Sequence, residues 1–147
     1  TASSLTDHDF CRSIDGDDVR VLGTFLETRR FEAGETIIRQ GDIADEVFLL
    51  MSGTVSVALD LPTGERRRLS TMAPGMVFGE LSIVDRAART ADVHADTAVE
   101  CLVLTVTELE RLETSHPRIA IGIMRNLLRN VHRTVLRMSQ EIAARNA

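Results

Sequence analysis

The residues best suited to chemistry lie in one short segment, residues 78–93. Gly79 lets the backbone approach a ligand closely, and Glu80 carries a carboxylate, which accepts hydrogen bonds from sugar hydroxyls. A helical turn over residues 80–84 would present unpaired N–H groups that favour an anion. Arg89 follows nine residues after Glu80, and its planar guanidinium suits a phosphate. The segment therefore offers groups for both the sugar and the phosphate of a nucleotide.

The order of these residues resembles the phosphate-binding cassette of the cyclic nucleotide-binding domain family. That family has Phe-Gly-Glu, Leu or Ile, a small residue and two apolar residues, then a spacer before Pro-Arg, a small residue, Ala, any residue and Val. The matching residues are Phe78, Gly79, Glu80, Leu81, Ser82, Ile83, Val84, Arg89, Thr90, Ala91 and Val93. Ala88 stands where the family usually has Pro. The absence of that Pro loosens the approach to Arg89 but removes no ligand group.

The resemblance implies a role for each residue of the cassette. Glu80 would bond the ribose 2′-hydroxyl, although a carboxylate there also suits the start of a helical turn. Arg89 would hold the cyclic phosphate, although it also suits an exposed strand, paired with Asp85 or Asp92. The ligand-binding set implied is Phe78, Gly79, Glu80, Leu81, Ser82, Arg89, Thr90 and Ala91.

Thr90 bears on which base is bound. In eukaryotic members of the family, a Thr after the Arg resembles the arrangement that favours cGMP, whereas bacterial members with Ser or Thr there often bind cAMP. The chain has no Trp or Tyr, so an aromatic lid of those types over the base is excluded. The ligand is therefore expected to be cAMP or cGMP. Because the chain resembles bacterial members of the family, cAMP is slightly favoured.

Length and composition predict one globular, cytoplasmic domain. The 147 residues are 44% hydrophobic and 27% charged, which is ordinary for a soluble protein. The net charge of −5 argues against broad nucleic-acid binding. The longest apolar run, residues 47–51, is far short of the ~20 residues that span a bilayer, and no signal segment opens the chain. A first residue of Thr1 leaves open a processed start or a piece of a longer protein.

The cysteines and histidines predict neither a disulfide framework nor a metal site. Cys11 and Cys101 are too few and too far apart for the first. The histidines lack metal-ligand spacing and are expected to be isolated surface or packing residues: His8, His94, His116 and His132. No cofactor is expected beyond the nucleotide ligand.

The middle of the chain predicts a β-rich domain. Glycines recur mostly every seven to twelve residues between short apolar segments, a rhythm typical of an antiparallel sandwich or barrel. The family resemblance covers about residues 19–113 and implies an eight-stranded β-roll flanked by helices. The rhythm alone would also allow a cupin-like roll with a metal, but the strands lack clustered metal ligands. Candidate strands are residues 29–31, 35–39, 46–51, 53–59, 65–71, 89–95 and 98–105.

Helices are expected at both ends of the roll. Asp15 or Asp17 would cap a helix that runs to about Thr28, with Val19, Leu22, Phe25 and Leu26 on one face. Residues 107–112 suit a short helix capped by Thr105 or Thr107, and Pro117 suits the first turn of a long one. The expected layout is one domain over 1–147: a helical segment 1–28, a β-roll 29–105 with the cassette 78–93, and C-terminal helices 106–147.

The long helix carries an apolar seam with heptad spacing. It either packs on the roll or pairs with a second copy in a homodimer, as in related transcription regulators. Four residues of the seam, Ile121, Met124, Leu128 and Val131, would also pack on the cassette and cover the base. A row of arginines away from the seam is read as a solvated face: Arg125, Arg129, Arg133 and Arg137. The seam consists of Ile121, Met124, Leu128, Val131, Val135, Met138 and Ile142.

The function that we predict is a cyclic nucleotide sensor without catalysis, which couples binding to movement of the C-terminal helix. It would regulate a fused enzyme, channel or transporter. One alternative is the sensor part of a transcription regulator, which would need a helix-turn-helix that the residues up to Ala147 do not include. The other is a degenerate roll that serves in oligomerisation or docking, against which the intact Glu80 and Arg89 count.

Overall fold

The computed structural model of the chain describes residues 5–43, 45–80, 89 and 91–145, with the side chains of Met138 and Arg145 outside that description. The expected cassette turn at residues 80–84, together with Leu81, Ser82 and Thr90 of the implied ligand set, therefore lies beyond Glu80 and outside the described residues.

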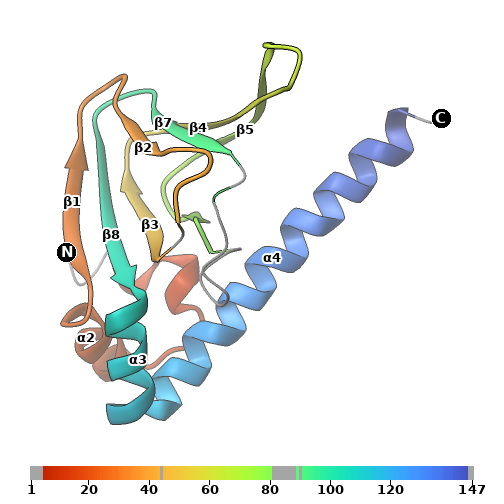
Figure 1. The fold of residues 1–147 in the computed structure, drawn as a ribbon. Coiled ribbons are helices and arrows are strands. Elements are labelled where there is room, and N and C mark those ends of the chain that lie inside the picture. Colours follow the sequence, from red (N-terminus) through yellow and green to blue (C-terminus); the bar gives the residue numbers. More distant parts are fainter. Residues whose placement is uncertain (1–4, 44, 81–88, 90, 146–147) are drawn as a thin grey trace.

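Two antiparallel four-stranded sheets form the body of the protein, with strand orders β1-β8-β3-β6 and β2-β7-β4-β5. Helices lie at one end of this β-roll, and a long C-terminal helix runs past it (Figure 1). The expected eight-stranded roll with flanking helices is thus confirmed. The strands are β1 Glu27–Phe31, β2 Thr36–Ile38, β3 Glu46–Ser52, β4 Val55–Asp60, β5 Arg66–Met72, β6 Val77–Phe78, β7 Asp92–Ala95 and β8 Val99–Thr105.

β6 is the strand that the sequence did not predict. Its two residues pair with β3, Phe78 opposite Phe48 and Val77 opposite Leu49. A two-residue strand has no alternation from which to recognise it, and this one leads directly into the cassette.

β3 divides the interior into two cores. Val47 and Leu49 pack with the helices at the end of the roll, whereas Phe48 and Leu50 pack inside it. Because successive side chains of a strand point to opposite faces, a fully buried strand contributes to both cores. β3 therefore fixes the helical layer against the roll.

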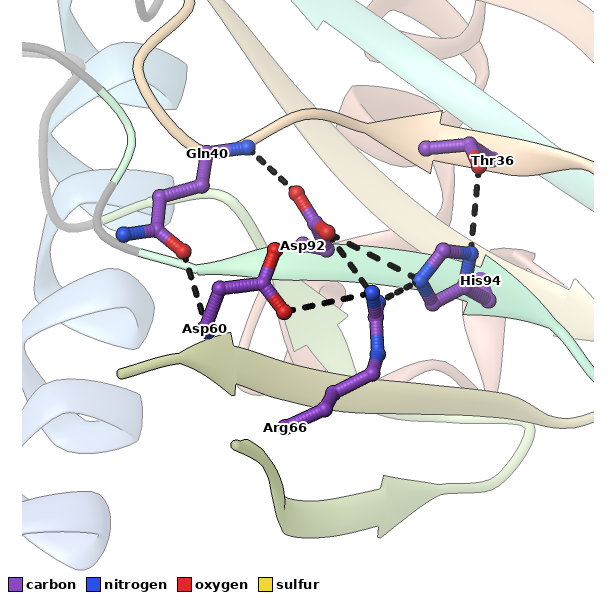
Figure 2. A network of polar contacts seen from close by, with 6 residues as sticks. All are labelled: Thr36, Gln40, Asp60, Arg66, Asp92 and His94. Carbon is purple, nitrogen blue, oxygen red and sulfur yellow. Dashed lines mark hydrogen bonds and ion pairs between the residues drawn. The ribbon is translucent and has the colours of Figure 1, made fainter. Parts of the chain in front are cut away.

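A network of charged and polar side chains connects strands of the sheet β2-β7-β4-β5 (Figure 2). Arg66 donates to Asp92 at 3.0 Å and to Asp60 at 3.4 Å, and it also contacts the ring of His94. The other ring nitrogen of His94 lies 3.1 Å from the hydroxyl of Thr36. The alternation of β7 thus sends Asp92 and His94 outward and leaves its other side for the interior of the roll.

Ser56 is a buried polar residue of β4. Its hydroxyl donates to Asp96 at 2.6 Å, and the Arg68 side chain contacts it from the outer side of the sheet. A long arginine side chain covers a neighbour in this way while its charged end stays near water.

The helices are η1 Asp9–Cys11, α2 Gly16–Gly23, α3 Val106–Ser115 and α4 Pro117–Arg145. The expected caps at Asp15 and Thr105 are confirmed, since their side chains accept from the N–H groups of Asp17 and Glu108. The expectation that the first helix runs to about Thr28 was wrong. α2 ends at Gly23, because the N–H and the hydroxyl of Thr24 both turn back to the carbonyl oxygen of Val21, and β1 begins soon after.

The helix α4 docks with a different face from the predicted seam. Its buried apolar residues are Ile119, Ala120, Ile123 and Leu127. In contrast, Ile121 is 54% exposed and Leu128 68% exposed, and Val135 and Ile142 are exposed as well. Packing of the seam on the roll is therefore ruled out for these four residues. Beyond its docked first part, α4 extends away from the helical end of the protein (Figure 1).

Among the residues that the structure describes, none of the helices is both long enough and apolar enough to cross a membrane.

Candidate functional site

A pocket of about 300 Å³ opens between the roll and α4, and it contains most of the described cassette residues. Its apolar wall comes from the sheet β2-β7-β4-β5 through Ile38, Val57, Leu69, Met72 and Val93. The cassette contributes Phe78, Gly79, Glu80, Arg89 and Ala91, and α4 contributes Thr134, Arg137 and Glu141. The structure thus gathers all of the implied ligand-binding residues that it describes around one cavity.

Arg89 is held at both its backbone and its guanidinium. Its Nη1 donates to the carbonyl oxygen of Gly79 at 2.6 Å and its Nη2 to that of Glu46 at 2.8 Å. Its backbone N–H and C=O bond to Asp42 and Gly41. Only 8% of the residue is exposed. Since a guanidinium has five N–H donors, these two bonds leave donors for an anion in the pocket.

The charge environment of Arg89 is mixed. Burial lowers the pKa of Arg89, while the negative charges of Asp45, Glu46 and Glu80 oppose that effect. Because the ordinary pKa of arginine is so high, the guanidinium stays protonated at neutral pH. It therefore acts as a fixed cation at the wall of the pocket.

Gly79 is the residue that allows the guanidinium to lie so close to the backbone. Its φ of +83° is in the region that side chains disfavour. A Cβ on this residue would lie 3.0 Å from Nη1 of Arg89 and 3.2 Å from the carbonyl oxygen of Glu46. A larger residue would thus push against the guanidinium that the carbonyl oxygens of Gly79 and Glu46 hold.

Glu80 supplies the carboxylate of the pocket. Burial raises its pKa, and this effect is opposed by its own backbone N–H, by a hydrogen bond from Asn130 and by the charge of Arg89. The Nδ2 atom of Asn130, on α4, donates to Oε1 of Glu80 at 2.6 Å. These donors favour the ionised form, which can accept a hydrogen bond from a ligand hydroxyl.

Phe78, the residue before Gly79, is anchored by aromatic packing. Its ring stacks on that of Phe48 with the centroids 5.0 Å apart and an interplanar angle of 2°, and it is almost completely buried. Phe78 therefore forms part of the wall and braces the backbone that leads into Gly79.

The contribution of α4 differs from what the sequence predicted. The residues expected to cover the base were Ile121, Met124, Leu128 and Val131, but the residues that line this pocket are Thr134, Arg137 and Glu141. Arg137 belongs to the row read as a solvated face, and the other two were missed. The available signal was the run of polar residues 130, 134, 137 and 141, which share one helical face.

Three of the four expected covering residues lie elsewhere. Ile121, Met124 and Leu128 line a separate groove of about 380 Å³ beside α3. They therefore belong to a surface distinct from the cassette pocket.

No group of three or more His, Cys, Asp and Glu side chains suited to a metal ion occurs in the part of the chain that the structure describes. The groups that line the pocket are the cations of Arg89 and Arg137, the carboxylates of Glu80 and Glu141, and an apolar wall. This arrangement suits a small ligand with an anionic end, hydroxyl groups and an apolar or aromatic part.

A β-roll whose pocket holds a buried arginine and a carboxylate and is bordered by a C-terminal helix is the architecture of a ligand-binding domain. The family model described as "Cyclic nucleotide-binding domain" matches residues 28–116, which is more than half of the chain. The chain belongs to the cyclic nucleotide-binding domain family, which is a regulatory and not a catalytic class of domain.

Similar proteins place this domain in several contexts. Glutaminase 2 of Bradyrhizobium diazoefficiens is 40% identical over 114 residues, which are 78% of this chain and 18% of that protein. The CRP-like cAMP-activated global transcriptional regulator of Mycobacterium tuberculosis is 29% identical over 79% of this chain and 52% of its own length. This chain thus spans about a fifth of the first relative and half of the second.

The fold has a close structural counterpart. The crystal structure of a cyclic nucleotide-binding domain from Methylobacillus flagellatus superposes with a TM-score of 0.92 over 98% of this chain and 83% of the other. At 19% identity, this likeness concerns the fold alone.

Proposed function

We propose that this chain is a sensor domain that binds cAMP or cGMP in the pocket between the β-roll and α4. The observation that carries the proposal is that Glu80 and Arg89, nine residues apart in the cassette, line the same cavity beside an apolar wall. One ligand with a cyclic phosphate, a ribose and a purine satisfies all three features.

Each part of the nucleotide has a proposed partner. The cyclic phosphate faces Arg89, which has N–H donors beyond the two that bond to Gly79 and Glu46, and the ribose 2′-hydroxyl donates to Glu80. The purine lies against the apolar wall that Val57, Leu69 and Met72 help to form. Leu81, Ser82 and Thr90 are kept in the proposed ligand set on the family resemblance. The choice between adenine and guanine stays open, and Thr90→Ala is the variant that tests whether its hydroxyl sets that choice.

Binding is proposed to act on α4. The helix borders the pocket through Thr134, Arg137 and Glu141, so a ligand in the pocket contacts both the roll and the helix. A ligand shifts a conformational equilibrium only through its different affinity for the two arrangements. Contacts on both sides of the pocket provide that difference, because they are all formed only when α4 lies next to the roll.

The output is proposed to pass to another domain or protein and not to a reaction in this chain. The relatives include an enzyme, Glutaminase 2, and a transcriptional regulator, and in both the matched region is only part of the protein. We accordingly expect an effector that is fused to this domain or bound by it.

A cytoplasmic location is proposed as well, since Cys11 and Cys101 are both free and buried.

A second copy of the chain is the proposed partner of the exposed seam. Exposed large apolar residues follow one another along α4, and such a row is typical of a helix that pairs. Sedimentation velocity tests this part: a dimer is expected, and Leu128→Glu is expected to shift it to monomer. A monomer at high micromolar concentration would contradict it. The exposed apolar residues of α4 are Ile121, Leu128, Val135, Leu136 and Ile142.

Thermal unfolding with and without nucleotide tests the proposed function. A ligand that binds only the folded state adds about 2.7 kcal/mol to its stability at a hundredfold excess over the dissociation constant. We expect cAMP or cGMP to raise the melting temperature by several degrees. An unchanged melting temperature with both nucleotides at millimolar concentration would refute the proposal.

A further inference from the structure

Two asparagines on α4, one helical turn apart, bond to different parts of the protein. Asn126 is buried, and its Nδ2 donates to the carbonyl oxygens of Phe10 at 2.7 Å and Arg12 at 3.0 Å. The Nδ2 of Asn130 donates instead to the carboxylate of Glu80 at 2.6 Å. The first asparagine thus ties α4 to the N-terminal segment, and the second ties it to the pocket.

Asn130 lies where the burial of α4 ends. Before it, Ile119, Ala120, Ile123, Asn126 and Leu127 are buried in the helical core. After it, none of the α4 side chains that the structure describes is buried. The bond to Glu80 is therefore made at the border between the docked part of the helix and the part that lines the pocket with Thr134, Arg137 and Glu141.

The chemistry of the bond fixes which way the amide faces. The Nδ2 of Asn130 donates to Glu80 and also lies 3.5 Å from the carbonyl oxygen of Val77, which can only accept, so the amide nitrogen and not the amide oxygen faces Glu80. A carboxylate has about four lone-pair positions, and Asn130 uses one on Oε1. The bond restrains the rotation of the carboxylate and leaves positions on it for a further donor.

We infer that Asn130 is a positioning residue for ribose recognition: its amide holds the Glu80 carboxylate in the orientation in which it accepts the 2′-hydroxyl of a cyclic nucleotide. This inference rests on the proposed function and extends it to α4. Selection of a 2′-hydroxyl then depends on where α4 lies, because the helix carries the residue that orients the acceptor. By reciprocity, a ribose bound to the oriented Glu80 stabilises α4 next to the roll.

The competing interpretation is that the bond only helps to anchor α4. The two interpretations differ in one measurable quantity, the ratio of affinities for a cyclic nucleotide and its 2′-deoxy analogue. Loss of an anchor weakens both ligands equally, whereas loss of orientation weakens only the ligand that has the hydroxyl. A thermodynamic cycle of two proteins and two ligands therefore separates them.

The test measures the dissociation constants of cAMP, 2′-deoxy-cAMP, cGMP and 2′-deoxy-cGMP by calorimetry. The proteins are the wild type, Asn130→Ala, Asn130→Ser, Asn130→Asp and the control Asn126→Ala, which makes the same substitution one turn earlier. Arg133→Ala is a milder control, because it removes the ion pair of α4 with Asp9 at 3.2 Å and leaves the pocket unchanged. Melting temperatures report whether each variant is folded.

In the wild type, the 2′-hydroxyl is expected to improve affinity about tenfold or more, as a hydrogen bond to a charged group does. In Asn130→Ala and Asn130→Ser, that ratio is expected to fall below about threefold. Asn130→Asp keeps the shape but sets a carboxylate against Glu80, so its ratio falls at least as far. The controls keep the wild-type ratio whatever happens to their melting temperatures.

Three results would overturn the inference while the proposed function stands: no 2′-hydroxyl preference in the wild type, an unchanged ratio in folded Asn130 variants, or an equal fall in the controls. Absence of binding by any cyclic nucleotide to the folded wild type would instead refute the proposed function, and the inference with it.

Discussion

The Nη1 atom of Arg89 donates a 2.6 Å hydrogen bond to the carbonyl oxygen of Gly79, ten residues earlier in the chain. Gly79 and Arg89 are therefore built as one unit: the carbonyl oxygen of Gly79 holds the guanidinium in place, and the guanidinium satisfies that carbonyl. The carbonyl of Glu46 on β3 completes the arrangement and ties it to the core strand.

Gly79→Ala is expected to destabilise the protein more than an ordinary glycine replacement. A Cβ there meets the φ of +83° and a contact of 3.0 Å with Nη1 of Arg89. Gly64→Ala is the matched control, since its φ is +88° with nothing within 4 Å of the added Cβ. Both variants bear the backbone strain of roughly 1–2 kcal/mol, and only Gly79→Ala bears the crowding. Urea unfolding measures the difference in the free energy of unfolding. Equal losses in the two variants would show that Gly79 is not packed closely against Arg89.

Arg89→Ala is expected to lower both stability and nucleotide affinity. It leaves the carbonyl oxygens of Gly79 and Glu46 without their donor, and an unsatisfied buried polar group costs about 1–3 kcal/mol. The control is Arg39→Ala, which removes the same charge from an exposed position. Chemical denaturation of both variants without ligand measures this. A fully stable Arg89→Ala protein would show that the two carbonyl bonds contribute nothing.

Acid is expected to weaken the fold through His8. Burial lowers the pKa of His8, opposed by its hydrogen bond with the carbonyl oxygen of Leu50 and by the charge of Asp9, and its Nδ1 accepts the N–H of Phe10 at 3.1 Å. Below about pH 6.5 the imidazole of His8 binds a proton in the unfolded chain but not in the folded chain, where its pKa is lower. The contribution of this histidine to stability is therefore complete above that pH and falls as the pH drops from there towards the lowered pKa.

Urea midpoints between pH 7.5 and 5.5 measure this dependence. The stability gap between the wild type and His8→Gln should shrink as the pH falls, by up to about 1.4 kcal/mol per pH unit. His132→Gln, at an exposed position on α4, should follow the wild type. A gap that stays constant across the range would mean that His8 titrates alike in the folded and unfolded chains.

Nucleotide is expected to slow hydrogen exchange in α4 as well as in the cassette. The helix lines the pocket through Thr134, Arg137 and Glu141, so a ligand that contacts both sides restrains its later turns. Exchange measured by mass spectrometry with and without cAMP should show added protection over residues 117–141 together with residues 79–91. Protection confined to the cassette would show that α4 does not respond to the ligand.

Much of the fold was predictable because its signals are local. Glycine-punctuated apolar segments marked seven of the eight strands, and the side chains of Asp15 and Thr105 marked two helix starts. The end of α2 was not predictable, since Phe25 and Leu26 continue the helical spacing while Thr24 turns the backbone away. Phe25 is buried nonetheless, so its apolar character was meaningful although its assignment to the helix was wrong.

The α4 side of the site was not predictable for a different reason. The sequence of an amphipathic helix shows which residues are apolar, but the rotation of the helix about its axis decides which face is buried against the rest of the domain. The seam of Ile121 and Leu128 was the obvious candidate, yet the neighbouring face with Ile123 and Leu127 is the one buried in the helical core. That rotation brings polar residues such as Arg137 to the pocket.

The most direct test of the central claim is a calorimetric titration of the folded chain with cAMP and with cGMP, repeated on Arg89→Ala and Arg39→Ala. The account predicts one site per chain with a dissociation constant in the micromolar range or below for at least one of the two nucleotides. Arg89→Ala should lose that binding at least tenfold, because a charge-assisted contact is removed, and Arg39→Ala should keep it. No heat from either nucleotide at millimolar concentration, or an equal loss in both variants, would contradict a pocket built around Glu80 and Arg89.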